Sequence, residues 1–246
     1  MNIVFSFDDG RNDAYDASKI LIKHGLRGSF HITTGFIDGS FLTDVFGVKR
    51  KPLTANQLLE MVRNKMDISS HGDRHVMNSE DFMVSRDKLS KLCGFKYKIG
   101  FSVPNSQYSD YELSSFREKN ISKLSYIRVG RSKKCYSLIM KVQYVLYHLF
   151  HLQICFNLFN KNNILKDVNK YEINSLVILS DTRSKNLVKF IEKYKDLNAT
   201  LVLMFHSIVE NPSDKWEYST KDFEEICDYI SKNCCVKTLE DIANEL

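Results

Sequence analysis

Short apolar runs alternate along this chain with longer amphipathic stretches. The runs have the length of buried strands and lie at 3–7, 28–33, 66–69, 98–103, 124–129, 176–179 and 200–205. Between and after them, apolar residues spaced three or four positions apart predict helices at 13–24, 54–63, 79–92, 108–119, 184–194, 220–231 and 239–246. Repeated strand–helix alternation predicts an α/β domain with a parallel sheet, either open or closed into a barrel.

Polar residues that can bind metals or transfer protons stand at or just after the ends of these predicted strands: Asp8, Asp9, His71, His75, Asp181 and His206. In parallel α/β sheets the functional residues gather at the carboxyl ends of the strands. We therefore expect these side chains to share one site.

The first two clusters have the chemistry of a metal centre. Adjacent carboxylates at Asp8 and Asp9 repel each other and require water or a cation, so one can hold a metal while the other moves protons. His71 and His75 are four residues apart, and one helical turn would direct both imidazoles the same way. One carboxylate and two histidines form a ligand set of open catalytic zinc sites. Each motif alone is also compatible with an ordinary turn, but their joint occurrence at strand ends favours the metal site.

Composition sets broad limits on the fold and partners. The 246 residues are 43% hydrophobic and 26% charged, which is typical of a globular enzyme. Ten glycines and three prolines leave no flexible linker, so we expect a single domain over 1–246. The net charge of +5 comes from scattered basic residues, which argues against a nucleic-acid partner.

The cysteines and the N-terminus predict a cytoplasmic location. The cysteines, at 93, 135, 155, 227, 234 and 235, include no Cys-x-x-Cys pair, and free thiols in a reducing compartment are the simplest interpretation. The apolar N-terminus has no basic leader and reaches Asp8 too soon for a signal peptide.

The stretch 136–159 interrupts the strand–helix pattern. It is strongly apolar, Lys141 is its only charged residue, and Lys133, Lys134 and Lys161 flank it. Interspersed glutamine, histidine and asparagine residues argue against a membrane span. Three interpretations stay open: a helix packed in the core, a homodimer interface, or docking on the inner face of a membrane.

Several motifs occur in the order found in one known family: Ser6-Phe7-Asp8-Asp9-Gly10, the segment 24–33, Ser70-His71-Gly72-Asp73-Arg74-His75, Leu203-Met204-Phe205-His206, and the segments 216–223 and 236–239. On these residues the chain resembles the polysaccharide deacetylase family, the NodB homology domain of carbohydrate esterases. The resemblance covers nearly the whole chain except an apolar helical insertion at about 136–170. It implies a distorted, incomplete (β/α) barrel of about seven strands.

The resemblance also implies an activity, the metal-dependent hydrolysis of an N-acyl amide. Asp9, His71 and His75 would bind one divalent metal ion, with zinc expected. Asp8 would act as the general base and His206 as the general acid.

The implied site also needs a group that stabilises the oxyanion and a cation that holds the catalytic base. A backbone N–H near Asn105 would help to stabilise the oxyanion. The family has an arginine two residues before a proline, which tethers the catalytic base, but this chain has Ser102 at that position. The missing cation would have to come from elsewhere, and the candidates are Arg74, Arg128, Arg131 and Arg183.

The family's fourth motif is absent in its standard form. Asp181 is the best substitute, and it would orient His206. The same residue is equally compatible with capping the helix predicted from Ser184.

The expected substrate is an acylated amino sugar, carrying an acetyl or a formyl group. A cytoplasmic member suits an intermediate of surface-polysaccharide synthesis, either free, nucleotide-linked or lipid-linked. Two alternatives stay open: a non-catalytic metal-binding relative that binds a glycan or a biosynthetic partner protein, and an amide hydrolase that acts on a non-sugar small molecule.

Overall fold

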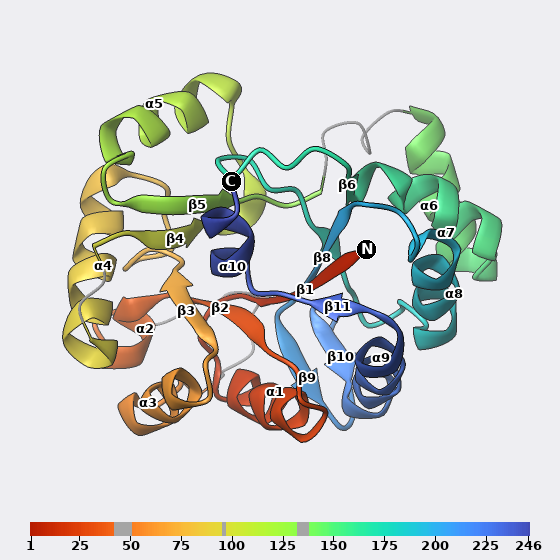
Figure 1. Ribbon diagram of the computed structural model, residues 1–246, viewed down its shortest axis with the longest axis horizontal. Helices are drawn as coiled ribbons and strands as arrows, with labels where there is room; N and C mark the ends of the chain where they lie inside the picture. The colour runs from red at the N-terminus through yellow and green to blue at the C-terminus, as the bar shows by residue number, and fades with distance from the viewer. Residues whose placement is uncertain (42–50, 95–96, 132–137) are drawn as a thin grey trace.

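A curled β-sheet forms the centre of the protein in this computed structural model, which describes residues 1–41, 51–94, 97–131 and 138–246. The sheet path runs β5-β4-β3-β2-β1-β8-β6, with β11 pairing on β1 and β7 on β8 (Figure 1). Its strands are β1 (Asn2–Phe7), β2 (Gly28–Ile32), β3 (Asp67–Ser70), β4 (Ile99–Ser102), β5 (Leu124–Arg128), β6 (Ile164–Leu165), β7 (Leu176–Val177), β8 (Thr200–Phe205) and β11 (Cys235–Val236). A second pair, β9 (Ser207–Val209) and β10 (Glu217–Ser219), lies beyond β8.

Helices pack around this sheet, and the last of them, Leu239–Asn244, lies against the middle of the strands in Figure 1 rather than on the outer side of the sheet. They are α1 (Asn12–Lys23), α2 (Thr34–Asp38), α3 (Ala55–Arg63), α4 (Ser79–Cys93), α5 (Asp110–Asn120), α6 (Leu138–Phe150), α7 (Gln153–Asn160), α8 (Ser184–Tyr194), α9 (Thr220–Asn233) and α10 (Leu239–Asn244). The predicted α/β class and the incomplete barrel with a seven-strand path are therefore confirmed. Of the sheet strands within the described residues, only β6 runs antiparallel to its neighbour.

The curl of the sheet depends on β1 and on the segment after β5. The first residues of β1 pair with β11, whereas Phe5–Phe7 pair with β2, so β1 leaves one neighbour for another along its length. Beyond β5, Ile173 pairs with Arg128, and the Ser175 N–H donates to the Gly130 carbonyl at 2.9 Å. This segment fills the gap between β5 and β7, so the carboxyl ends of the strands face one hollow.

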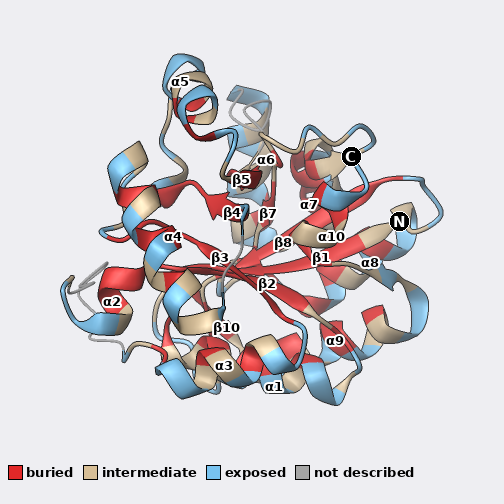
Figure 2. Cartoon of the chain, turned by 60° about the vertical axis from the view of Figure 1, so that its left-hand side comes forward, coloured by how far each residue is buried: buried red, intermediate tan, exposed pale blue. Residues whose placement is uncertain are grey.

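A cluster of buried phenylalanine rings packs around the last residue of β1. The Phe7 ring stacks on Phe30 at 4.6 Å and on Phe205 at 5.4 Å between centroids, and Phe223 packs edge-on against Phe7 at 5.9 Å. All four are buried, and the strands form the most buried part of the molecule in Figure 2. Burying each such ring contributes about 1.5–3 kcal/mol, so the backbone that carries the two aspartates is firmly held.

The predicted insertion contains two helices, α6 and α7, and its first residues Tyr136 and Ser137 lie outside the described part of the chain. The interpretation as a buried core helix holds for one face of α7, where Cys155, Phe156 and Phe159 are buried. It fails for α6, in which Tyr147 alone is buried.

Among the described residues, no helix has the length and apolarity that a bilayer span requires.

Candidate metal and catalytic site

Asp8 and Asp9 follow the last residue of β1 at a sharp backbone turn. The Asp8 N–H still donates to the Phe205 carbonyl of β8 at 3.1 Å, which extends the sheet by one residue. Asp9 and Gly10 then adopt φ angles of 76° and 81°. Aspartate tolerates this left-handed region better than most residues, and such conformations concentrate at functional sites. The turn directs both buried carboxylates into the hollow.

Asp9, His71 and His75 bring three ligand atoms together. The Nε2 atoms of the two histidines are 3.1 Å apart, and each lies 3.6 Å from Oδ1 of Asp9. Ligand atoms held tetrahedrally at zinc–nitrogen and zinc–oxygen bond lengths are separated by roughly 3.3 Å. The three predicted ligands therefore fit a divalent metal ion of zinc's size, with one coordination position left for water.

The imidazole of His71 is prepared for metal binding by its second nitrogen. Nδ1 lies 2.9 Å from the carbonyl oxygen of Ser102, so it carries the proton and donates it to that oxygen. Nε2 then presents a lone pair towards Asp9 and His75. Burial lowers the pKa of His71 to about 3, although the Asp8 carboxylate opposes this effect. The ring is therefore neutral at neutral pH, as a ligand must be.

The second oxygen of Asp9 is held by an arginine that the sequence analysis did not single out. Arg11 Nη2 lies 2.8 Å from Asp9 Oδ2, and its Nη1 donates to the Ser207 hydroxyl at 3.1 Å. Burial raises the pKa of Asp9, but His206 and Arg11 outweigh burial and bring the pKa below its ordinary value. Arg11 thus leaves Oδ1 directed at the two histidines.

Arg128, at the end of β5, supplies the cation that is missing at Ser102, two residues before Pro104. Its fully buried guanidinium donates to both carboxylate oxygens of Asp8 and to the Ser102 hydroxyl. Ser102 and Arg128 are register partners in the β4–β5 pairing, and the Ser102 hydroxyl lies 3.3 Å from Asp8 Oδ1. Burial raises the pKa of Asp8, but Arg128 and the neighbouring His71 hold it well below its usual range. Among the four arginines considered from the sequence, Arg128 is the one that contacts Asp8.

His31, in β2, is a second residue of the site that the sequence analysis did not single out. Its Nδ1 lies 3.4 Å from Asp8 Oδ1, and its Nε2 lies 3.1 Å from the hydroxyl of Tyr126. That hydroxyl donates to Asp67 at 2.8 Å, so it accepts from His31. The sequence does carry a signal for His31, namely its position along β2. Phe7 of β1 pairs with Phe30 of β2, so His31 comes level with Asp8, and alternate residues of a strand face the same side of the sheet.

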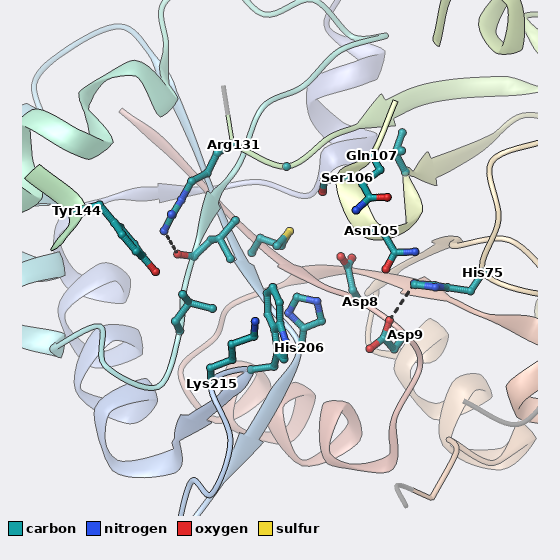
Figure 3. A pocket seen from close by; sticks show the side chains of 16 residues that line it. Asp8, Asp9, His75, Asn105, Ser106, Gln107, Arg131, Tyr144, His206 and Lys215 are labelled. Atoms are coloured by element: carbon teal, nitrogen blue, oxygen red, sulfur yellow. Dashed lines mark hydrogen bonds and ion pairs between the residues drawn. The ribbon is translucent and has the colours of Figure 1, made fainter. Parts of the chain in front are cut away.

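His206 and Asn105 line the same cavity as the two aspartates (Figure 3). The cavity has a volume of about 430 Å³. His206 follows β8, and its ring lies 4.5 Å from that of Trp216. Burial lowers the pKa of His206, whereas the carboxylates of Asp9 and Asp8 raise it, and the net shift is downward. Asn105 lies in a 3₁₀ turn with φ of 55°, after Pro104. Both residues are thus where the sequence placed them.

The expected contact between Asp181 and His206 is not formed. The Asp181 carboxylate pairs instead with the His148 ring of α6, within the insertion. The buried Nδ1 of His206 has no hydrogen-bond partner among the described residues. Asp181 follows β7 as predicted, but β7 spans only Leu176 and Val177, and the chain after it turns towards α6. The role proposed for Asp181 is corrected to that of an anchor for α6.

Charge balance at this site predicts that the metal-free protein stays folded. Each buried aspartate has its own arginine, Asp8 with Arg128 and Asp9 with Arg11, so the pair needs no metal to offset its charge. Chelation should leave the far-UV circular dichroism at 25 °C unchanged and lower only the melting temperature, because bound metal adds about 2.7 kcal/mol at a hundredfold excess over its Kd. Loss of secondary structure on chelation would show that the metal is structural.

No protein-family model and no curated protein matches this sequence at a significant level. Solved structures do match its fold. A family 4 acetyl xylan esterase from Clostridium thermocellum in complex with a cobalt ion superposes with a TM-score of 0.57 at 12% identity, covering 100% of this chain and 91% of its own. A peptidoglycan N-acetylglucosamine deacetylase gives 0.55 at 12% identity, covering 98% and 86%. A carbohydrate esterase family 4 pseudoenzyme from Bacillus anthracis gives 0.52 at 10% identity, covering 99% and 66%.

These matches confirm, at the level of the fold, the resemblance to the polysaccharide deacetylases. At 10–12% identity, the likeness is one of fold.

Proposed function

We propose that this chain, which has the fold of the carbohydrate esterase family 4 deacetylases, is a metal-dependent hydrolase that removes an N-acyl group from an amino sugar. One observation carries the proposal. Asp9 and His75 line one cavity at the carboxyl ends of the strands together with two further titratable residues, Asp8 and His206, and the third candidate ligand, His71, lies within reach of Asp9 and His75. This is the arrangement that amide hydrolysis requires, namely a metal, a base and an acid.

Asp9, His71 and His75 would hold the ion, for which zinc is our proposal because two neutral imidazoles and one carboxylate suit it. When bound, the metal supplies a water of lowered pKa and a positive charge near the developing oxyanion. The chain's own contribution to the oxyanion would be a backbone N–H near Asn105.

Asp8 would accept the proton of the attacking water. Arg128 keeps its carboxylate ionised and fixes its position, because the guanidinium binds both oxygens. The same contact makes Asp8 a weaker base, so the water must itself be acidified for the transfer to be efficient. His206 would donate a proton to the nitrogen of the leaving amine.

The cavity lining supports a phosphorylated sugar, which a nucleotide-linked or lipid-linked intermediate of surface-polysaccharide synthesis would be. Trp216 and Tyr144 offer aromatic rings, and Arg131 and Lys215 offer positive charge. Figure 3 places these two cations on the side away from Asp9 and His75. An acyl group at the metal-binding residues would therefore leave a phosphate within reach of the cations.

A cytoplasmic location is also part of the proposal. Cys93, Cys155, Cys227, Cys234 and Cys235 are free thiols, which supports a reducing compartment.

A second candidate is a binding protein that retains the metal site without catalysis. The unpartnered Nδ1 of His206 favours it, because no described residue accepts or donates a hydrogen bond at that nitrogen to orient the ring as a general acid. The buried contact between Asp8 and Arg128 argues for catalysis, because it positions a carboxylate that is not among the three ligands.

The test is metal content together with activity, measured on the natural chain and on Asp9→Ala. We expect about one equivalent of zinc or a similar ion in the natural chain, and its loss in the variant, because removing the only carboxylate of the triad leaves two ligands. Release of acetate or formate from acylated amino sugars should be lost with the metal.

Asp16→Ala, on the exposed surface of α1, is the matched control and should keep both properties. Bound metal without hydrolysis of any acylated sugar would favour the binding protein. Absence of metal even after zinc addition would refute the metal site.

A further inference from the structure

Helix α6 is amphipathic, but its apolar face points to solvent and its more polar face packs against the protein. Its outward face carries large apolar side chains that are exposed: Leu138, Ile139, Val142, Val145, Leu146, Leu149 and Phe150. Leu138 is 78% exposed and Leu149 66%. Its inward face carries Tyr144, Tyr147 and His148. Surface helices normally turn their apolar stripe to the core.

Specific contacts hold α6 in this orientation. The Tyr147 ring is buried 5.0 Å from that of Phe156, and the backbone N–H of Arg183 donates to its hydroxyl at 3.2 Å. His148 pairs with Asp181, and the Arg131 guanidinium lies 5.4 Å from the centre of the Tyr144 ring. Rotating the helix to bury its apolar stripe would break each of these contacts.

The exposed face continues onto α7. Leu152, Ile154 and Leu158 are also exposed, and α6 and α7 lie together at one end of the molecule in Figure 1. We call the ten exposed apolar residues of 138–158 the hairpin face. An apolar surface gathered on one element in this way marks an interaction site rather than ordinary surface scatter.

Charge identifies the occupant of the hairpin face. The segment 131–165 contains Arg131, Lys133, Lys134, Lys141 and Lys161 and no acidic residue. A symmetric dimer would bring this face against itself, so Lys141 would approach a surface whose own segment offers no carboxylate to pair with. An anionic bilayer supplies the negative charge that a second copy lacks, together with an apolar layer for the leucine, valine and phenylalanine side chains.

We propose that the hairpin face docks this protein onto the surface of a bilayer that contains anionic lipids. Helix α6 has 13 residues, about 20 Å of helix, so it lies along the interface with its outward stripe among the acyl chains. Lys141, which is exposed on the same helix, reaches the headgroups.

Docking also positions the catalytic cavity. Tyr144 of α6 and Arg131 both line it, so the helix that contacts lipid forms one wall of the site (Figure 3). If the proposed function holds, the substrate is the lipid-linked form of the amino sugar, delivered from the same bilayer. Docking itself does not depend on that function.

The experiment is sedimentation of the full chain with vesicles of phosphatidylcholine, with or without phosphatidylglycerol. We expect binding to the anionic vesicles, weakened by salt, and little binding to phosphatidylcholine alone. Val142→Asp with Leu149→Asp should weaken binding at least about tenfold, because both positions lie at the centre of the apolar stripe. Lys141→Gln should weaken it about fivefold.

Tyr111→Asp is the matched control, because Tyr111 is 81% exposed on α5, away from the hairpin face. It should bind vesicles like the natural chain. Turnover of a water-soluble acylated sugar should be equal in all these variants, and sedimentation needs no turnover, so failure of the proposed function would leave this result readable.

Three results would overturn docking: no binding by the natural chain, equal loss with Tyr111→Asp, or binding that is insensitive to phosphatidylglycerol. Self-association of the natural chain in the absence of vesicles, abolished by Val142→Asp with Leu149→Asp, would assign the face to a dimer instead.

Discussion

Replacing Arg128 with methionine should lower the free energy of unfolding by about 3–5 kcal/mol, because the change leaves the buried carboxylate of Asp8 without its cation. Methionine approximates the length of the aliphatic part of arginine, so cavity formation adds little. The measurement is urea unfolding of the metal-free protein, so that metal affinity does not contribute. Activity should fall together with stability, because Asp8 loses the group that fixes its position.

The control is Arg117→Met on α5, an arginine whose side chain is partly exposed and 3.8 Å from Glu118. Surface changes of this kind alter stability by less than about 0.5 kcal/mol. A similar loss in both variants would mean that the effect reflects the removal of any arginine.

The pH dependence of the Arg128→Met effect has a defined sign. Arg128 holds the pKa of Asp8 below its unfolded value, so the stabilisation is fully present above about pH 4 and is lost as pH falls through the folded pKa. The difference in stability between the natural chain and the variant should therefore be largest near neutral pH and should shrink in acid. A difference that stays constant down to pH 3 would contradict a charge-based role for Arg128.

Exchanging the residues at 102 and 128 tests whether Asp8 needs only a nearby guanidinium or needs it to come from β5. Ser102 and Arg128 are register partners on β4 and β5, so Ser102→Arg with Arg128→Ser delivers a guanidinium to Asp8 from the neighbouring strand. This exchange places an arginine two residues before Pro104, as in the polysaccharide deacetylase motif that the sequence resembles. We expect it to recover part of the stability and activity that Arg128→Ser alone loses. No recovery would show that the β5 position itself is required.

The arginine at 128 illustrates what the sequence could and could not predict. Asp8 and Arg128 are separated by 120 residues, and their strands, β1 and β5, are not neighbours in the sheet. Strand ends can be predicted from apolar runs, and the candidate ligands Asp9, His71 and His75 from the residue types and spacing at those ends. Contact across the hollow depends instead on how strongly the sheet curls, which no local pattern encodes.

The predictions for the Asp181 side chain and for the packing of the insertion were wrong for a related reason. The sequence correctly placed Asp181 after a strand, but the direction of its side chain depends on α6, whose packing the apolar composition of 136–159 did not determine. A stretch that is apolar on most sides indicates a helix, but it does not indicate which face of that helix packs against the protein. In α6, the inward side chains proved to be those of Tyr147 and His148 rather than the leucine, isoleucine and valine side chains.

Replacing His206 with alanine should reduce kcat by about 10²–10⁴-fold while leaving the metal content unchanged, because the residue lies in the cavity but outside the ligand triad. If His206 is the general acid of the proposed function, it must be protonated to act, so the activity of the natural chain should fall as pH rises through the pKa of this ring. Burial brings that pKa below its ordinary value. The residual activity of His206→Ala should lack this alkaline decline.

His24→Ala provides the comparison for this prediction. His24 follows the last turn of α1, at the opposite end of that helix from Asp9 and Arg11, and should alter neither kcat nor the pH profile. Parallel loss of metal and activity in His206→Ala would make His206 a fourth ligand, and unchanged kcat would remove its role as the acid. Because a structural role would not erase one limb of a pH profile, the shape of that profile distinguishes proton donation from support of the fold.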